Sequence, residues 1–166
     1  MSLVDNCGRP LLNLRISITQ RCNNQCAYCH REGEVQRANL LAEKMSLQEI
    51  VRISKTAVSL GIARIKLTGG EPLMRKDIRE IISGIAALPG LKDLSLTTNG
   101  LLLGGMAKEL HDCGLNRINI SLPSLNPETY RKLTGGKIEN ALAGVKAAVD
   151  AGFCPVKLNM VILKDV

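Results

Sequence analysis

The sequence predicts an α/β protein in which about five parallel strands alternate with helices. Short apolar runs recur along the chain, and each ends in a polar or glycine-rich turn that leads into a helical pattern. Hydrophobic residues make up 45% of the 166 residues, whereas aromatic residues make up 2%. A core of Leu, Ile, Val and Ala is typical of buried parallel strands covered by helices.

The strands are expected where short runs are rich in Ile, Val and Leu. Each run has about the length of an ordinary strand. The five expected strands cover residues 14–19, 64–68, 92–97, 117–122 and 156–163.

The helices between these strands have readable ends. Ser46 followed by Glu49 forms a capping box, and Gly61 ends that helix. Asn126 and Pro127 open a short helix as N-cap and first residue. The other helices are expected at residues 76–88, 106–113 and 139–151. The alternation is continuous, so we expect one domain over residues 1–166, with the irregular stretch 31–44 as a candidate lid over the site.

Charge and composition restrict the partners. The formal net charge is +7, which favours anionic ligands such as phosphates. Aromatic residues do not interleave with the basic ones, which argues against nucleic acid. Residues 1–10 do not resemble a signal peptide, and no apolar run approaches the roughly 20 residues of a membrane span. We therefore expect a cytoplasmic protein with no membrane partner, whose six cysteines are thiols or metal ligands.

The unusual loops all follow strands. In parallel α/β sheets, ligands bind at the carboxyl ends of the strands, where the loops lead into helices. A single site is therefore expected where four loops meet, namely residues 19–29, 68–72, 97–100 and 121–124.

The first of these loops carries Cys22, Cys26 and Cys29, spaced by three residues and then by two. Thiolates are the usual ligands of iron–sulfur clusters, and a cubane cluster needs one ligand for each iron. Three local cysteines leave the fourth iron open to another molecule. This spacing favours a cluster that takes part in chemistry.

Two plainer interpretations of the loop stay open. One is a structural zinc site completed by His30 or a distant cysteine, although His30 adjoins Cys29 and is poorly placed to share one ion with it. The other is a non-catalytic electron-transfer module with a fully ligated cluster. Its fourth ligand would come from the scattered cysteines Cys7, Cys113 and Cys154.

The cysteine loop resembles the CxxxCxxC signature of radical S-adenosylmethionine (SAM) enzymes, with Tyr28 as the aromatic residue before the last cysteine. Residues 69–72, Gly-Gly-Glu-Pro, are similar to the GGEP loop of these enzymes. The resemblance implies a partial (β/α) parallel barrel, open or truncated. It also implies a 4Fe-4S cluster on the three cysteines, whose open iron binds SAM and whose electron cleaves SAM to give a 5′-deoxyadenosyl radical.

Several further segments are similar to one branch, the GTP 3′,8-cyclases of the molybdenum cofactor biosynthesis protein A (MoaA) family. They are residues 5–17, 67–75, 96–100, 117–122 and 156–162. The resemblance implies a lyase that converts GTP to (8S)-3′,8-cyclo-7,8-dihydroguanosine 5′-triphosphate in molybdopterin synthesis. It also implies an electron donor, which could be flavodoxin-like, ferredoxin-like or another reductant, and it is compatible with a homodimer.

The resemblance also assigns residues by position. Arg15, Lys66 and Lys157 suit a triphosphate clamp, because they are cations at strand ends. The paired glycines would offer backbone amides and carbonyls to the methionine part of SAM, and Glu71 would reach its amine. The expected SAM contacts are Tyr28, Gly69, Gly70, Glu71 and Ser121. The expected GTP contacts are Arg15, Lys66, Thr97 and Lys157.

The sequence departs from the family in several respects. His30 follows Cys29 where the family commonly has Met-Pro. Pro123 stands where the family has an acidic residue, which puts a polar contact there in doubt. The family has a second three-cysteine cluster, and no residue after Lys157 can provide it. The family barrel has six strands, of which five are expected here. We therefore expect the N-terminal part of such an enzyme, which would not cyclise GTP alone. A radical SAM enzyme that acts on a peptide or another small molecule is the alternative.

Overall fold

The computed structural model describes residues 3–29 and 45–164. Its five strands form one sheet in the order β1-β2-β3-β4-β5, and every neighbouring pair is parallel. The strands are β1 (Asn13–Ser17), β2 (Arg64–Thr68), β3 (Asp93–Thr98), β4 (Arg117–Ser121) and β5 (Val156–Asn159). The predicted α/β fold, with about five parallel strands that do not close a barrel, is confirmed. His30 and the candidate lid at residues 31–44 lie outside the described residues.

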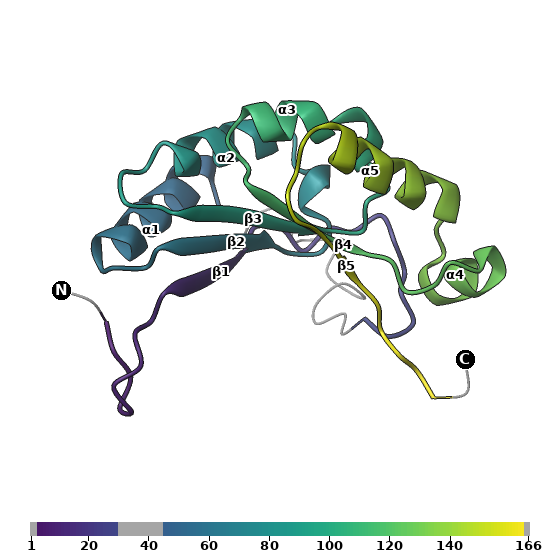
Figure 1. Ribbon diagram of the computed structural model, residues 1–166, viewed down its shortest axis with the longest axis horizontal. Coiled ribbons are helices and arrows are strands. Elements are labelled where there is room, and N and C mark those ends of the chain that lie inside the picture. The colour runs from purple at the N-terminus through teal and green to yellow at the C-terminus, as the bar shows by residue number, and fades with distance from the viewer. Residues whose placement is uncertain (1–2, 30–44, 165–166) are drawn as a thin grey trace.

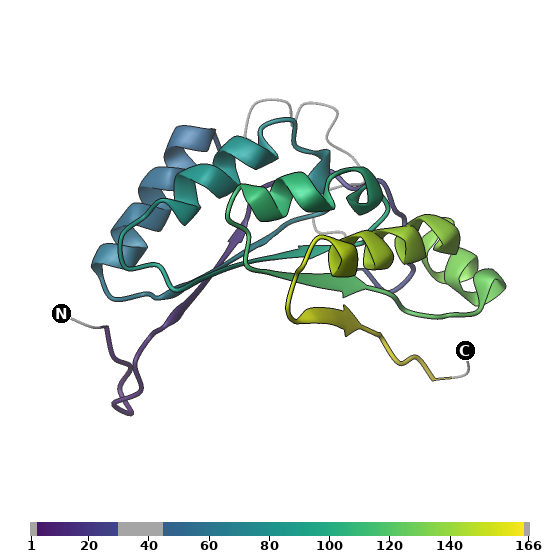
Figure 2. The same cartoon turned by 45° about the horizontal axis from the view of Figure 1, so that its top comes forward.

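The helices lie on one side of the sheet. Figures 1 and 2 show α1, α2, α3 and α5 along the same face, with α4 near the carboxyl end of β4. The helices are α1 (Leu47–Ser59), α2 (Ile78–Ala86), α3 (Ala107–Asp112), α4 (Pro127–Thr134) and α5 (Ile138–Asp150), with short 3-10 turns at Pro72–Met74 and Leu103–Gly105. The opposite face carries no helix from the described part of the chain, and we call it the open face.

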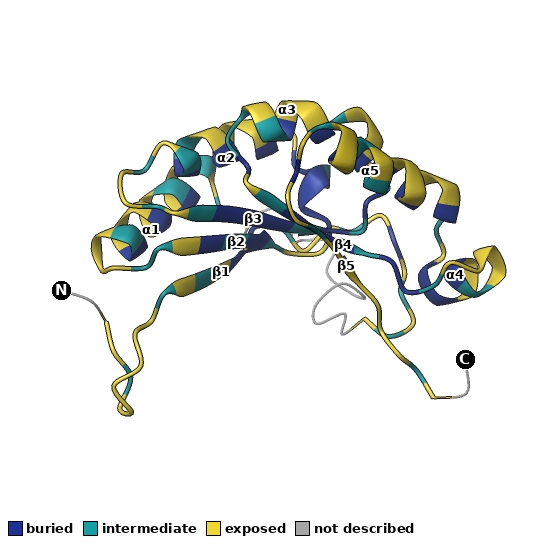
Figure 3. Cartoon of the chain, in the orientation of Figure 1, coloured by how far each residue is buried: buried dark blue, intermediate teal, exposed yellow. Residues whose placement is uncertain are grey.

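The strands alternate between the two faces. In β2, Ile65 and Leu67 are buried under the helices, while Lys66 between them points to the open face. Successive side chains of a strand point to opposite sides, so each strand has one apolar and one polar row. Figure 3 shows the buried residues gathered between helices and sheet. The open face is therefore polar, which is unusual for a parallel sheet.

The two predicted helix starts, at Ser46 and at Asn126, are confirmed. Ser46 Oγ accepts a hydrogen bond from Glu49 N at 3.2 Å, and Ser46 N donates to Glu49 Oε2 at 2.8 Å, which completes the capping box. Asn126 Oδ1 accepts from Thr129 N at 3.0 Å at the start of α4. Gly135 ends α4 with a φ of 72°, a conformation that favours glycine.

Two strands end two or more residues before the predicted position, while the ends of β3 and β4 each differ by one residue. β1 ends at Ser17, although Ile18 N still donates to Thr68 O at 2.9 Å. β5 ends at Asn159, four residues before the predicted end, and Ile162 beyond it is 91% exposed. β5 pairs with β4 alone, and β4 ends at Ser121, so the apolar run after Asn159 has no strand to pair with in the described residues.

Candidate functional site

The cysteine loop follows β1 and is fastened to the loop after β2. Gly70 N donates to Thr19 O at 2.7 Å, and Glu71 N donates to Arg21 O at 2.7 Å. These two bonds place the start of the cysteine loop against the carboxyl end of β2. The expectation that both amides are available to a ligand is wrong for Gly70, because its N–H already has this partner.

The two glycines allow this close approach. A Cβ on Gly69 would lie 2.3 Å from Thr19 O, and one on Gly70 would lie 2.4 Å from Arg21 O. Gly69 also has a φ of 152°, which side chains rarely adopt. The backbone of the β2 loop therefore lies so close to the backbone of the cysteine loop that a side chain at either position would collide with it. This close approach requires glycine at both positions.

The far side of the cysteine loop is fastened to the end of α4. Gln25 N donates to Thr134 O at 2.9 Å, and Ala27 N donates to Leu133 O at 2.8 Å. These carbonyls belong to the last turn of α4. No backbone N–H of the helix is available to carbonyls in a last turn, so the cysteine loop supplies the donors. The loop therefore bridges the carboxyl end of the sheet from β2 to α4.

The three cysteines share this loop at different depths. Cys22 and Cys26 are half-buried, Cys29 is exposed, and Cys29 N donates to Cys26 O at 3.1 Å in a tight turn. In the part of the chain that the structure describes, no three His, Cys, Asp or Glu side chains are close enough together to hold a metal ion. The fold brings the three thiols to one loop but does not arrange them as ligands.

The surroundings of Cys22 nevertheless suit a thiolate ligand. Its Sγ accepts a hydrogen bond from Asn24 N at 3.5 Å and from Asn99 Nδ2 at 3.9 Å. Donors aimed at sulfur favour the thiolate form and are typical around iron–sulfur clusters. Three soft ligands, of which Cys22 has two hydrogen-bond donors at its sulfur, fit an iron–sulfur cluster.

The other cysteines lie at the opposite end of the sheet. Cys7, Cys113 and Cys154 each precede a strand, β1, β4 and β5 respectively. In a parallel sheet the amino ends of the strands are on the edge away from the carboxyl-end loops. This geometry gives no support to a fourth cysteine ligand from within the described residues.

Tyr28 and Ser121 lie at the carboxyl end of the sheet with the cysteine loop. Tyr28 is half-buried, and burial, followed by the nearby Cys26 thiol, raises its pKa well above the ordinary value. The phenol is therefore neutral and can donate a hydrogen bond. Ser121 is the last residue of β4 and is half-buried on the open face.

Glu71 lies inside the protein. Its side chain is 0% exposed, and Oε1 accepts from Leu73 N at 3.1 Å and from Thr98 Oγ1 at 2.7 Å. Oε2 accepts from Asn99 N at 2.7 Å. Burial raises the pKa of this carboxyl, and the three hydrogen bonds oppose that rise. Here Glu71 ties the β2 loop to the β3 loop, and both of its oxygens are engaged by the protein.

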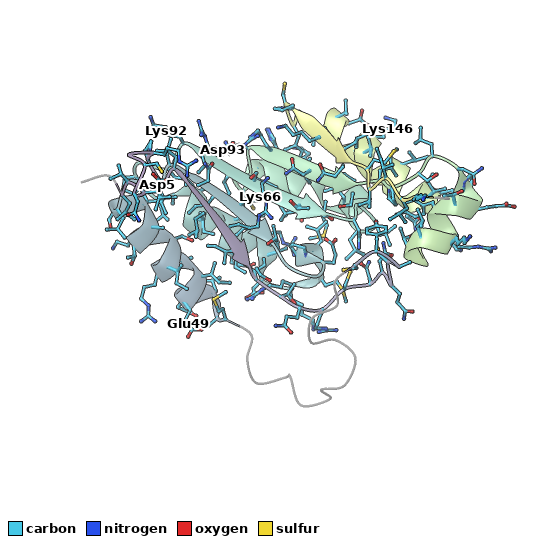
Figure 4. The ribbon with its side chains drawn as sticks, turned by 90° about the horizontal axis from the view of Figure 1, so that it is seen from below. Asp5, Glu49, Lys66, Lys92, Asp93 and Lys146 are labelled. Carbon is cyan, nitrogen blue, oxygen red and sulfur yellow. The ribbon has the colours of Figure 1, made fainter. Side chains whose placement is uncertain are left out.

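Four of the expected ligand-binding residues share the open face. Arg15 pairs with Lys66 across β1 and β2, and Lys157 pairs with Asn119 across β4 and β5. Asn119 in turn pairs with Thr97 of β3. Figure 4 views this face, with Lys66 and Asp93 labelled on it. Burial and then the charges of Arg15, Arg117 and Lys157 lower the pKa of Lys66. The open face therefore carries cations from four strands, β1, β2, β4 and β5.

Sequence reasoning missed three polar residues on the same face. Arg117 Nε donates to Asp93 Oδ1 at 2.6 Å, and the second arm of the guanidinium binds Asp93 Oδ2. Asn119 is 6% exposed, and its Oδ1 has no hydrogen-bond partner in the described structure. The alternation of side chains along a strand could have found two of them. Arg117 and Asn119 are four and two residues before Ser121, so all three side chains point to the same face of β4.

A comparison with protein families identifies the fold. The family model of the radical SAM superfamily matches residues 16–166. The chain belongs to the radical SAM superfamily. Enzymes of this superfamily use a 4Fe-4S cluster and SAM, so the two expected cofactors are those of the family.

Curated relatives narrow the resemblance. The chain is 50% identical to the probable GTP 3′,8-cyclase of Methanosarcina mazei, over 99% of this chain and 49% of the relative. It is 46% identical to the GTP 3′,8-cyclase of Geobacter sulfurreducens, over 100% of this chain and 51% of the relative. The chain thus spans about half the length of the curated relatives it matches.

Solved structures agree on the fold. Methylornithine synthase (PylB) matches with a TM-score of 0.71 at 23% identity, over 90% of this chain and 44% of that chain. Streptococcus suis SuiB bound to S-adenosylmethionine matches with a TM-score of 0.76 at 21% identity, over 93% of this chain and 35% of that chain. At these identities the likeness concerns the fold of the radical SAM core. None of the described helices is long and apolar enough to cross a membrane.

Proposed function

We propose that this chain is the N-terminal part of a GTP 3′,8-cyclase, a lyase of molybdenum cofactor biosynthesis. The product would be (8S)-3′,8-cyclo-7,8-dihydroguanosine 5′-triphosphate. One observation carries the proposal. The cysteine loop lies across the carboxyl end of a sheet, and Arg15, Lys66 and Lys157 lie on the open face of the same sheet. An anionic nucleotide on that face would lie beside the cofactor loop. The chain is 50% and 46% identical in sequence to two proteins named GTP 3′,8-cyclase, which supports GTP cyclisation over another radical SAM reaction.

Cys22, Cys26 and Cys29 would hold the cluster, which supplies the one-electron chemistry that cleaves SAM. The loop that carries them is held from β2 and from α4, so its ends are fixed before a cofactor arrives. Asn24 N and Asn99 Nδ2 would then donate to the Cys22 sulfur. In this proposal the protein shields and orients the cofactors and leaves the radical chemistry to them.

SAM would lie between the cysteine loop and the strand ends. We propose that Tyr28, Gly69, Gly70 and Ser121 contact it, because these residues surround the carboxyl ends of β2 and β4. Glu71 would act by holding the backbone of the β2 loop, because its oxygens are bonded to the β3 loop and the 3-10 turn.

GTP would bind the open face through its triphosphate. Arg15, Lys66 and Lys157 lie on this face. Burial and then the charges of its neighbours lower the pKa of Lys66, and a phosphate chain would offset the repulsion between these cations. Thr97 is half-buried in the same row as Lys157 and can hydrogen-bond the ligand. We expect the electron to come from a flavodoxin-like or ferredoxin-like protein or another reductant, in the cytoplasm.

Anaerobic turnover of the full-length protein tests this function. Reconstituted protein with SAM, GTP and dithionite should form 5′-deoxyadenosine and the cyclic nucleotide, and Cys26→Ser should form neither. Cys113→Ser, which changes a cysteine at the amino end of β4, is the matched control and should retain both products. 5′-Deoxyadenosine without a GTP product would point to another substrate, such as a peptide. A reduced cluster whose spectrum SAM leaves unchanged would indicate an electron-transfer module.

A further inference from the structure

The side chain of Asn99 links the loop after β3 to the cysteine loop. Its Nδ2 donates to Asn23 Oδ1 at 2.7 Å and lies 3.9 Å from Cys22 Sγ, which also accepts from it. Its Oδ1 accepts from Leu101 N at 3.0 Å, which fixes the orientation of the amide. Because a backbone N–H can only donate, the atom bonded to Leu101 N must be the amide oxygen of Asn99. The other atom is therefore the NH₂ group, and it faces the cysteine loop.

The backbone of Asn99 is held by the buried Glu71. Asn99 N donates to Glu71 Oε2 at 2.7 Å, and Thr98 Oγ1 donates to Glu71 Oε1 at 2.7 Å. Thr98 Oγ1 also accepts from Gly100 N at 3.0 Å. A continuous set of hydrogen bonds therefore runs from a fully buried carboxylate to the sulfur of Cys22. Such a network holds a donor in place without help from a ligand.

We propose that Asn99 is a positioning residue that donates a hydrogen bond to the Cys22 thiolate and raises the reduction potential of the cluster. The inference rests on the proposal that Cys22, Cys26 and Cys29 hold that cluster. Reduction adds negative charge to the cluster and its thiolates, so a donor to sulfur stabilises the reduced form more than the oxidised form. Glu71 serves the same end indirectly, because it holds Asn99 in place.

The test is a redox titration of the reconstituted full-length protein, followed by electron paramagnetic resonance, with iron and sulfide counted per chain. Asn99→Ala should bind the same amount of iron and have a more negative midpoint potential. At the wild-type midpoint, the ratio of reduced to oxidised cluster should fall by up to about tenfold, which for a one-electron couple is about 59 mV. Asn99→Asp keeps an acceptor for Leu101 N and loses the donor, so it should shift the potential in the same direction.

Asn116→Ala is the matched control. Asn116 Oδ1 accepts from Leu94 N at 2.8 Å ahead of β4, at the other end of the sheet, so the potential should not change. A wild-type potential in Asn99→Ala with full iron would overturn the inference and leave the cluster proposal standing. Loss of iron from both Asn99 variants would also overturn it, in favour of a purely structural role. Wild-type protein that takes up no cluster would instead refute the proposed function.

Discussion

Lys66 lies directly opposite Arg15 in the parallel pairing of β1 and β2, and both side chains are on the open face. Burial lowers the pKa of Lys66 below its ordinary value, and the repulsion between the two neighbouring cations lowers it further. The pair lies at the middle of β1 and β2, and not at the strand ends where the sequence placed these cations. A bound polyanion would turn the repulsion into attraction.

Replacing Lys66 should therefore weaken the binding of a triphosphate. Lys66→Met keeps the aliphatic stem and removes the charge, so the affinity of the full-length protein for GTP should fall by about tenfold, as expected for a lost hydrogen bond between charged groups. Wild-type affinity should also fall as the pH rises through the pKa of Lys66, which lies below 10.5, because only the protonated amine attracts phosphate. Isothermal titration calorimetry measures both effects.

Lys108→Met serves as the control for Lys66. Lys108 is on α3, on the helix-covered side of the sheet, and pairs with the exposed Asp112 at 2.8 Å. Its replacement should leave GTP affinity unchanged at low and high salt. Equal losses in the two variants would show that net charge, and not the open face, determines binding.

The elements of the fold could be predicted because local patterns determine them. The capping box of Ser46 and Glu49, the helix start at Asn126 and the strand of Arg64–Thr68 all follow from neighbouring residues. The meeting of the loops was predictable too, since parallel strands bring their carboxyl ends to one edge. The end of β5 was not, because strand length there depends on whether β4 extends far enough to pair with it.

The polar contacts of the site depend on distances between segments that are far apart in the sequence. Glu71 reaches Thr98 and Asn99 across 27 and 28 positions, and Asn99 reaches Cys22 across 77. The residue types of these loops were clear from the sequence, but the burial of Glu71 was not. A carboxylate beside two glycines suggests a ligand contact until the structure shows that the protein itself occupies both oxygens.

Gly70 should tolerate no side chain. In Gly70→Ala the new Cβ would lie 2.4 Å from Arg21 O and 2.6 Å from Gln20 O, so the cysteine loop must move. We expect reconstituted protein to bind much less iron and to lose about 2 kcal/mol of unfolding free energy in urea. Gly105→Ala is the control, because a Cβ there meets nothing within 4 Å. Full iron content in Gly70→Ala would contradict the close approach of the two loops.

The ion pair of Asp93 and Arg117 should give a pH-dependent contribution to stability. Hydrogen bonds from Arg117 hold the pKa of Asp93 below its usual 3.8. Because the folded-state pKa is depressed, the contribution is present above pH 3.8 and is lost as the pH falls through the folded-state value. Arg117→Ala should cost about 1 kcal/mol at pH 7 and less at pH 3, measured by urea unfolding. Lys146→Ala, which breaks an exposed pair with Asp150, should cost little at either pH.

Removal of the Arg75 side chain should cost more stability than removal of Lys66, Arg117 or Arg79. It is 3% exposed, and its Nη1 donates to Ile18 O at 2.7 Å and to Met45 O at 2.9 Å. Its Nε and Nη2 bind the two oxygens of Asp77 at 2.9 Å and 2.6 Å. One guanidinium thus fastens the residue that leads into the cysteine loop to the residue just before the N-cap of α1.

Arg75→Met fills much of the same volume but removes the donor to the carbonyls of Ile18 and Met45. A buried acceptor that loses its donor costs about 1–3 kcal/mol, and the carbonyls of Ile18 and Met45 both lose one, so we expect a loss of about 3 kcal/mol and a lower urea midpoint with an unchanged slope. Iron uptake should fall as well, because Ile18 no longer fixes the start of the loop. Arg79→Met breaks a pair with Glu109 in which both side chains are about half exposed, and it should change stability by less than about 1 kcal/mol. Similar losses in the two variants would mean that Arg75 acts as an ordinary surface charge and that the cysteine loop is anchored by its backbone bonds alone.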